Sequence, residues 1–219
     1  VASIWGFTVD DNRRAADALA GVDGIVAVEV NVSCPNLEDR RRMFAHHADS
    51  AREVLGATAG CGLPRWAKLS PNVTDLGPIV DAVVAGGAEA VTLINTVMGM
   101  VIDVETGRPV LGAGGGGLSG PAIRPVAVRA IHDTVAEHPD LPVVGVGGVA
   151  RGEHAVELLM AGARAVQVGT ATFADPDAPT RVLDELVSWC ERHGVGQVDD
   201  LIGTAHGPHD EEWKGRHAG

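Results

Sequence analysis

The sequence contains no tyrosine, only three phenylalanines and four tryptophans, and it carries a formal net charge of −12. Nucleic-acid-binding surfaces depend on basic grooves that neutralise phosphate groups and on aromatic side chains that stack against bases. An acidic chain with few aromatic rings offers neither. The composition therefore argues against a nucleic-acid partner.

Long apolar runs and clustered cysteines are also missing. No run approaches the roughly 18 consecutive apolar residues that can span a bilayer, and no charged segment followed by an apolar one opens the chain. The three cysteines, Cys34, Cys61 and Cys190, form no Cys-x-x-Cys pattern and no Cys/His cluster of the metal-binding type. Widely spaced cysteines favour a reducing compartment. We therefore expect a cytoplasmic protein without membrane association or a bound metal.

Glycine, in contrast, is abundant, with 29 among 219 residues, and many glycines follow short apolar runs. These runs alternate with segments of helical spacing, which predicts βαβ units and a parallel sheet. The expected strands cover residues 2–5, 25–30, 64–69, 88–94, 141–146 and 163–168. The expected helices cover residues 10–20, 49–58, 74–85, 121–138, 152–161 and 179–193. Between them, residues 97–120 form the longest irregular segment, and loops of this length are usually functional or disordered.

The predicted strands correspond to part of a TIM (β/α)8 barrel, an α/β fold that needs eight strands. Barrel phosphate sites are commonly built after strands seven and eight, and the last two strands here end in glycine, so the six strands match strands 3 to 8. An open doubly wound sheet is the alternative, but its Gly-x-Gly-x-x-Gly would follow the first strand, where Trp5-Gly6-Phe7 stands. We expect one barrel over residues 1–207, incomplete at its N-terminus, and a mobile tail at 208–219 whose histidines do not bind metal.

Glycines at the ends of the last two strands predict an anion site. The backbone N–H groups of Gly147, Gly148, Gly169 and Thr170, with the helix N-termini that follow, would suit a phosphate monoester. The same glycines could instead serve only the close packing of helices on the sheet. Lys68, at the end of another strand, would be costly inside a barrel unless it met a negative ligand, and otherwise it extends to solvent at the rim.

The stretch Asn31-Val-Ser-Cys-Pro-Asn36 follows a β-branched strand that Pro35 prevents from continuing. Cys34 could act there as a nucleophile or as a proton acceptor, and its alternative is a small buried apolar side chain. No histidine can be assigned as its partner. The amides of Asn31, Asn36 and Asn95, with the Thr96 hydroxyl, would suit a flat polar ring, although asparagine is also a common turn residue.

Six motifs, in this order, make the chain resemble the dihydroorotate dehydrogenase family from about Ser3 to Gly207. They are Asn31-Val-Ser-Cys-Pro-Asn36, Lys68-Leu-Ser-Pro-Asn72, Ile94-Asn-Thr96, Gly116-Gly-Leu-Ser-Gly-Pro121, Val146-Gly-Gly-Val149 and Val168-Gly-Thr170. The resemblance implies a barrel that binds FMN and oxidises (S)-dihydroorotate to orotate in pyrimidine biosynthesis.

The resemblance also implies roles for individual residues. Cys34 would remove the C5 proton of the substrate while a hydride passes from C6 to flavin N5. The orotate ring would be held by Asn31, Asn36, Asn95 and Thr96. The FMN would be held by Ser3, Asn31, Lys68, Ile94, Gly120, Gly147, Gly148, Gly169 and Thr170. Lys68 would lie beside the flavin and favour its anionic reduced form.

A cysteine base is typical of the soluble class of this family. Residues 95–109 are most similar to the subclass that passes electrons to NAD through a partner subunit carrying FAD and an iron-sulfur cluster. We therefore expect dihydroorotate and that subunit as partners, in a homodimer or heterotetramer. The alternatives are a fumarate-linked enzyme, a dihydropyrimidine dehydrogenase domain and, from another class, a flavin- or phosphate-binding barrel without catalysis.

Two departures from the family pattern stand out. Ser3 occupies a position where relatives often have asparagine near the flavin. The first two strands of the family are absent, and with them an FMN-contacting lysine and an Asn-x-x-Gly-Leu substrate loop. We therefore expect the 219 residues to be a fragment that does not hold FMN stoichiometrically by itself.

Overall fold

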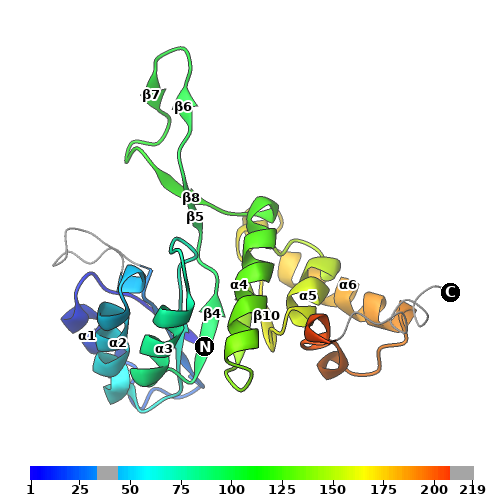
Figure 1. Cartoon of the computed structure of the whole chain (residues 1–219), viewed down its shortest axis with the longest axis horizontal. Coiled ribbons are helices and arrows are strands. Elements are labelled where there is room, and N and C mark those ends of the chain that lie inside the picture. Colours follow the sequence, from blue (N-terminus) through cyan, green and yellow to red (C-terminus); the bar gives the residue numbers. More distant parts are fainter. Residues whose placement is uncertain (34–43, 208–219) are drawn as a thin grey trace.

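The computed structural model describes residues 1–33 and 44–207 of the chain. The predicted site residues Cys34 and Asn36 and the predicted tail at 208–219 lie outside these ranges. Within them, a parallel sheet runs through the middle of the molecule, helices cover it, and one arm projects from it (Figure 1).

The sheet has six parallel strands in the order β1-β2-β3-β4-β9-β10. The strands are β1 (Ala2–Ile4), β2 (Val28–Asn31), β3 (Arg65–Lys68), β4 (Ala90–Leu93), β9 (Val143–Val146) and β10 (Ala165–Gln167). All six predicted strands are confirmed, although each is shorter than predicted. Part of the excess comes from residues that flank the strands and are buried without belonging to them, such as Leu69, Ile94 and Ala163.

Six α-helices follow the strands. They are α1 (Val9–Asp17), α2 (Ala48–Ala57), α3 (Gly77–Ala85), α4 (Arg124–Glu137), α5 (Gly152–Met160) and α6 (Ala178–Arg192). Short 3-10 turns are η1 (Phe44–His46), η2 (Thr58–Cys61), η3 (Pro121–Ile123), η4 (Thr170–Phe173), η5 (Val198–Leu201) and η6 (Thr204–His206). Figure 1 shows α1, α2 and α3 over the first strands and α4, α5 and α6 over the last.

Two predicted helix starts are wrong. The helix predicted from residue 74 begins only at Gly77, where the Asp75 side chain accepts a hydrogen bond from the Gly77 N–H at 3.0 Å. Pro121 opens the separate turn η3, and α4 begins only at Arg124. In both places several turn-forming residues stand close together, so the sequence pattern does not single out the one that the chain uses.

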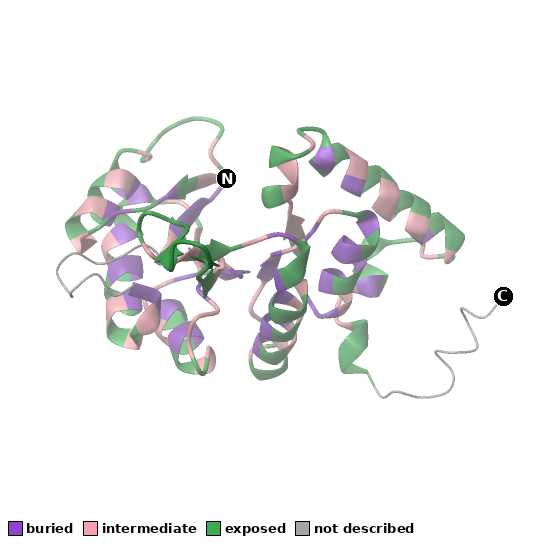
Figure 2. Ribbon diagram, turned by 90° about the horizontal axis from the view of Figure 1, so that it is seen from above, coloured by how far each residue is buried: buried purple, intermediate pink, exposed green. Residues whose placement is uncertain are grey.

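Alternate residues of each strand face the helices. Val28 and Val30 of β2 are fully buried and share an apolar core with Val54 and Leu55 of α2. Because successive strand residues point to opposite faces, Glu29 points to the inner face of the sheet. Figure 2 shows the buried residues concentrated along the strands and on the helix faces turned toward them.

The sheet is curled, and on its inner face the Glu29 side chain of β2 contacts strands from both ends of the sheet. Its carboxylate oxygens accept hydrogen bonds from Ser3 Oγ of β1 at 3.2 Å, Thr92 Oγ1 of β4 at 2.9 Å and Gln167 Nε2 of β10 at 2.9 Å. Since β1 and β10 are the two ends of the strand order, one carboxylate joins both edges of the sheet. This bonding pattern requires the partly closed curvature of a barrel.

Residues 97–118 form an arm that extends away from the sheet (Figure 1). Its base pairs β5 (Val97–Gly99) with β8 (Gly116–Leu118), and its tip pairs β6 (Ile102–Asp103) with β7 (Arg108–Pro109), both antiparallel. The sequence predicted only an irregular segment here. The ladders are too short and too rich in glycine for a periodic strand pattern to show.

No helix within residues 1–33 and 44–207 is both long enough and apolar enough to cross a membrane.

Candidate functional site

A cavity of about 460 Å³ opens where β3, β4, β9 and β10 end. This is the edge of a parallel α/β sheet at which ligands bind. Nine of the residues predicted to form the site line the cavity. They are Lys68, Ile94, Asn95, Thr96, Gly120, Gly147, Gly148, Gly169 and Thr170. Predicted residues up to 102 positions apart in the sequence, Lys68 and Thr170, thus share one cavity.

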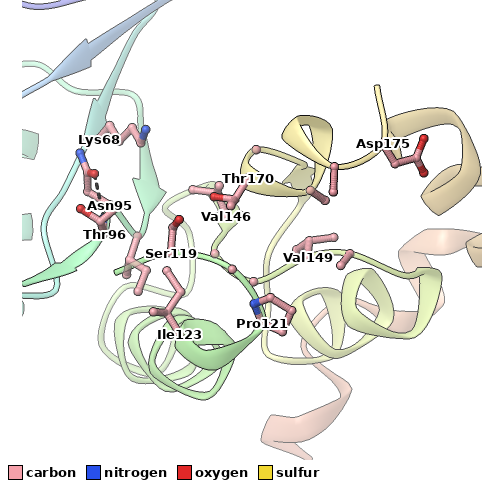
Figure 3. Close-up of a pocket in the computed structure, with 18 of the residues that line it drawn as sticks. Lys68, Asn95, Thr96, Ser119, Pro121, Ile123, Val146, Val149, Thr170 and Asp175 are labelled. Atoms are coloured by element: carbon pink, nitrogen blue, oxygen red, sulfur yellow. Dashed lines mark hydrogen bonds between the residues drawn. The ribbon is translucent and has the colours of Figure 1, made fainter. Parts of the chain in front are cut away.

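One side of the cavity carries polar side chains from the end of β3 and from the segment that follows β4. Lys68, Asn95 and Thr96 lie on this side in Figure 3. The Asn95 amide donates to Asn31 Oδ1 at 3.3 Å, and its own oxygen accepts from the Thr96 N–H at 2.8 Å. Asn31 pairs directly with Lys68 across the β2–β3 ladder. The structure therefore brings together four residues that the sequence predicted for the site.

Lys68 is half-buried, and among the described residues its ammonium group has no ion-pair or hydrogen-bond partner. The predicted alternative was a lysine that extends into solvent at the rim. A half-buried cation that borders a cavity is stabilised by an anionic group placed inside that cavity. The position of Lys68 therefore favours a ligand that carries or develops negative charge.

The other side of the cavity is formed by backbone. Gly147 and Gly148 have φ angles of 132° and 74°, which side chains other than glycine adopt rarely. A Cβ atom added at Gly148 would lie 2.7 Å from Arg124 Cβ, whereas one added at Gly169 would meet nothing within 4 Å. Gly148 therefore serves close packing as well as the cavity. Packing against the described neighbours does not account for Gly169, whose backbone borders the cavity directly.

His154 of α5 contacts a lining residue on this side of the cavity, Ala150, and was not predicted from the sequence. Its side chain is buried, and Nδ1 accepts a hydrogen bond from the Ala150 N–H at 3.1 Å. Burial lowers the pKa of His154, and the positive charges of Arg124 and Arg151 lower it further. The ring is therefore held neutral, as this hydrogen bond requires. A lone histidine in an amphipathic helix gives no sequence signal for such a role.

Arg181 of α6 also lines the cavity and was missed. Its guanidinium contacts Asp175 Oδ2 at 2.9 Å and Glu185 Oε1 at 3.0 Å, and it donates to the Ala150 carbonyl at 3.1 Å. The two carboxylates balance its charge. Arg181 therefore joins α6 to Ala150, two residues after Gly148. Among the described residues that line this cavity, Lys68 is the cation without a carboxylate partner.

Two predicted residues lie near the cavity without lining it. Asn31 contacts Asn95, as described above, and Ser3 donates to Glu29. Two residues after β2, Ser33 Oγ donates a hydrogen bond to the Lys68 carbonyl at 3.5 Å. The chain beyond β2 therefore passes close to the end of β3. Cys34 is the next residue in the sequence and lies outside the described ranges, as does Asn36.

The sequence profile of the family described as dihydroorotate dehydrogenase matches residues 1–189. A relative from Desulforudis audaxviator, named dihydroorotate dehydrogenase B (NAD(+)), catalytic subunit, is 46% identical over 207 residues. The alignment covers 94% of this chain and 67% of that relative.

The chain belongs to the dihydroorotate dehydrogenase family.

A second relative and a solved structure are also similar to this chain. A protein from Solibacter usitatus, named putative dihydroorotate dehydrogenase A (fumarate), is 43% identical, with 93% of this chain and 67% of that protein covered. The crystal structure of a dihydroorotate dehydrogenase from Eimeria tenella in complex with ferulenol superposes with a TM-score of 0.73 at 23% identity. The superposition covers 91% of this chain and 58% of the solved chain, so the two proteins share this fold. The chain thus spans about two thirds of the curated relatives' length.

Membership of this family implies a flavin cofactor, and the residues present fit one. A flavin nucleotide has a phosphate end and a ring end. The cavity offers glycine backbone on one side and, on the other, the Asn95 amide and the Lys68 ammonium, which has no partner among residues 1–33 and 44–207. Its volume is within the ~300–1,000 Å³ range of small-molecule sites.

Proposed function

We propose that the chain is the catalytic part of an FMN-dependent dihydroorotate dehydrogenase that oxidises (S)-dihydroorotate to orotate in pyrimidine biosynthesis. The observation that carries this proposal is the single cavity in which Lys68, Asn95 and Thr96 face the glycines that follow β9 and β10. One cavity with a polar side and a backbone side suits a substrate ring stacked beside a phosphorylated cofactor.

The phosphate of FMN would be bound by backbone N–H groups of Gly147, Gly148, Gly169 and Thr170, since glycine lets the backbone approach closely. Ile94 and Gly120 also line the cavity and would complete the FMN contacts. Lys68 would neutralise negative charge on the ring system. Bound FMN would supply the acceptor for the hydride that leaves C6 of dihydroorotate.

The chain's own residues would hold the substrate and move its proton. Asn31, Asn36, Asn95 and Thr96 would bind the carbonyl and N–H edges of the ring, because amides both donate and accept hydrogen bonds. Cys34 would remove the C5 proton. It follows Ser33 in the sequence, and Ser33 contacts the Lys68 carbonyl. Ser3, which lies against Glu29, is the weakest of the proposed FMN contacts.

We propose further that electrons pass to NAD through a partner subunit carrying FAD and an iron-sulfur cluster, in a cytoplasmic assembly that is a homodimer or a heterotetramer. The NAD(+) catalytic subunit names among the relatives support this subclass. A fumarate-linked enzyme is the second candidate, because a relative with the fumarate name is 43% identical.

Anaerobic mixing of the FMN-loaded protein with dihydroorotate tests the reaction. The flavin absorbance should bleach and orotate should form in equal amount, and unchanged absorbance would contradict the proposal. Reoxidation by fumarate without a partner would favour the second candidate over the NAD-linked one. A non-catalytic flavin-binding barrel would hold FMN and never bleach.

Cys34→Ser separates the base from the rest of the site. A hydroxyl is a far weaker base than a thiol, so bleaching should slow by about 100-fold or more at neutral pH while FMN stays bound. Equal rates in the two proteins would remove Cys34 from the mechanism.

A further inference from the structure

The pairing between β3 and β4 continues beyond the ends of both strands. The Leu69 N–H donates to the Thr92 carbonyl at 3.0 Å, and the Asn95 N–H donates to the Leu69 carbonyl at 2.8 Å. After Leu69 the chain turns through Ser70 and Pro71, and backbone pairing with the segment beyond Asn95 ends. The backbone from Thr96 onward would therefore lose its neighbour on this side.

The side chain of Asn72 takes the place of the missing strand. Its Nδ2 donates to the Thr96 carbonyl at 2.9 Å, and its Oδ1 accepts from the Met98 N–H at 2.8 Å. In a parallel ladder one residue bonds in this way to the two residues that flank its opposite number, here Val97. The Nδ2 also donates to Ser70 Oγ at 2.8 Å, which fixes the orientation of the amide.

These bonds hold the base of the arm against the end of β3. Val97 of β5 pairs with Leu118 of β8, and the next residues, Ser119 and Gly120, line the cavity. The side chain of Thr96 packs so closely on Gly117 that a Cβ atom there would overlap it. Asn72 therefore fixes the backbone of Thr96 on one side and, through the β5–β8 pair, the cavity wall at Ser119 on the other.

We propose that Asn72 is a positioning residue for the ring-binding side of the cavity. It does not line the cavity itself, and it acts by fixing the backbone on which Asn95 and Thr96 stand. This inference rests on the proposed function, which assigns those two side chains to the substrate. The glycines after β9 and β10, on the opposite side, have no contact with Asn72 among the described bonds.

The test compares Asn72→Ala and Asn72→Asp with the FMN-loaded wild-type protein. Alanine removes both bonds to the arm, whereas aspartate keeps the acceptor for Met98 and loses the donor to Thr96. Orotate is titrated, and its affinity is read from the change in the flavin spectrum. Asn72→Ala removes two hydrogen bonds that fix the backbone of the ring-binding side. We therefore expect the Kd for orotate to be about ten-fold higher than in wild type, and the KM for dihydroorotate to rise in parallel.

FMN content and melting temperature separate positioning from general damage. Both variants should keep the FMN content of the wild-type protein prepared in the same way, because the proposed phosphate side is not altered. If Asn72→Ala does not fold, Asn72→Asp carries the test, since it fills the same volume. Val104→Ala is the matched control on the same arm, where the side chain is 87% exposed, and it should leave the orotate Kd unchanged.

The outcomes decide the inference separately from the proposed function. An orotate Kd within two-fold of wild type in both variants would overturn it, and so would FMN loss that matches the loss of orotate binding. A wild-type protein whose flavin spectrum does not respond to orotate would instead contradict the proposed function.

Discussion

The hydrogen bonds of Glu29 allow a quantitative prediction about the stability of the curled sheet. Glu29→Ala removes the acceptor for Thr92, which is fully buried, for the partly buried Gln167, and for the Ser3 hydroxyl. Ser3 is exposed and can bond to water instead. The buried Thr92 hydroxyl and the partly buried Gln167 amide then lose their acceptor, at a cost of about 1–3 kcal/mol each.

Part of this cost is offset, because alanine no longer requires the desolvation of a carboxylate. We therefore expect the free energy of unfolding to fall by about 3 kcal/mol, which lowers the melting temperature of a chain of this size by roughly 6–12 °C. Glu29→Gln keeps the shape and one acceptor oxygen, so it should cost only about 1 kcal/mol. Urea unfolding followed by circular dichroism measures both values.

A double-mutant cycle tests whether the bond between opposite edges of the sheet is responsible. Glu29→Ala and Gln167→Ala should show a coupling free energy of about 1 kcal/mol or more, since they remove two ends of one hydrogen bond. Glu53→Ala, on the exposed face of α2, is the control and should stay within about 0.5 kcal/mol of wild type. A loss below about 1 kcal/mol in Glu29→Ala, or additive single changes, would refute the reasoning.

Two further predictions concern the glycine side of the cavity. In Gly169→Ala the added Cβ meets no atom within 4 Å, so the free energy of unfolding should stay within about 0.5 kcal/mol of wild type while the affinity for FMN falls. Gly148→Ala, at φ 74° and against Arg124, should lower the free energy of unfolding by about 1–3 kcal/mol. Equal FMN affinity in Gly169→Ala and wild type would contradict a role of Gly169 in FMN binding. Because burial lowers the pKa of His154 in the folded state, its contribution to stability is complete above the unfolded value of about 6.5 and is lost as pH falls below it. Between pH 7 and pH 5 the wild-type protein should therefore lose more stability than His154→Phe, and parallel unfolding curves against pH would contradict this.

Much of the fold could be predicted because apolar runs and their glycine or proline ends survive in the sequence as local patterns. The six strands and their order of succession follow from those patterns. The side-chain contact between the two ends of the strand order does not follow from them. Nothing near Glu29 in the sequence indicates that Gln167, 138 positions later, is its hydrogen-bond partner. The structure alone shows this contact.

The site divides in the same way. Lys68, Asn95 and the glycines after β9 and β10 could be predicted because each lies at or just after the end of a strand, where side chains or backbone meet the ligand edge. Arg181 and His154 could not, because each lies within a helix whose pattern is set by burial and charge. Asn72 belonged to a recognised motif, but its role depends on the arm, whose short ladders have no periodic signal.

The arm has a consequence for how such a chain can diverge. β4 pairs directly with β9, although 49 residues separate the end of one from the start of the other, and the arm is contained in that interval. Its length and surface can therefore change by insertion or substitution without shifting any register in the sheet. Surface specialisation and chemistry can therefore evolve on separate parts of this polypeptide, while Asn72 fixes the base of the arm against the end of β3.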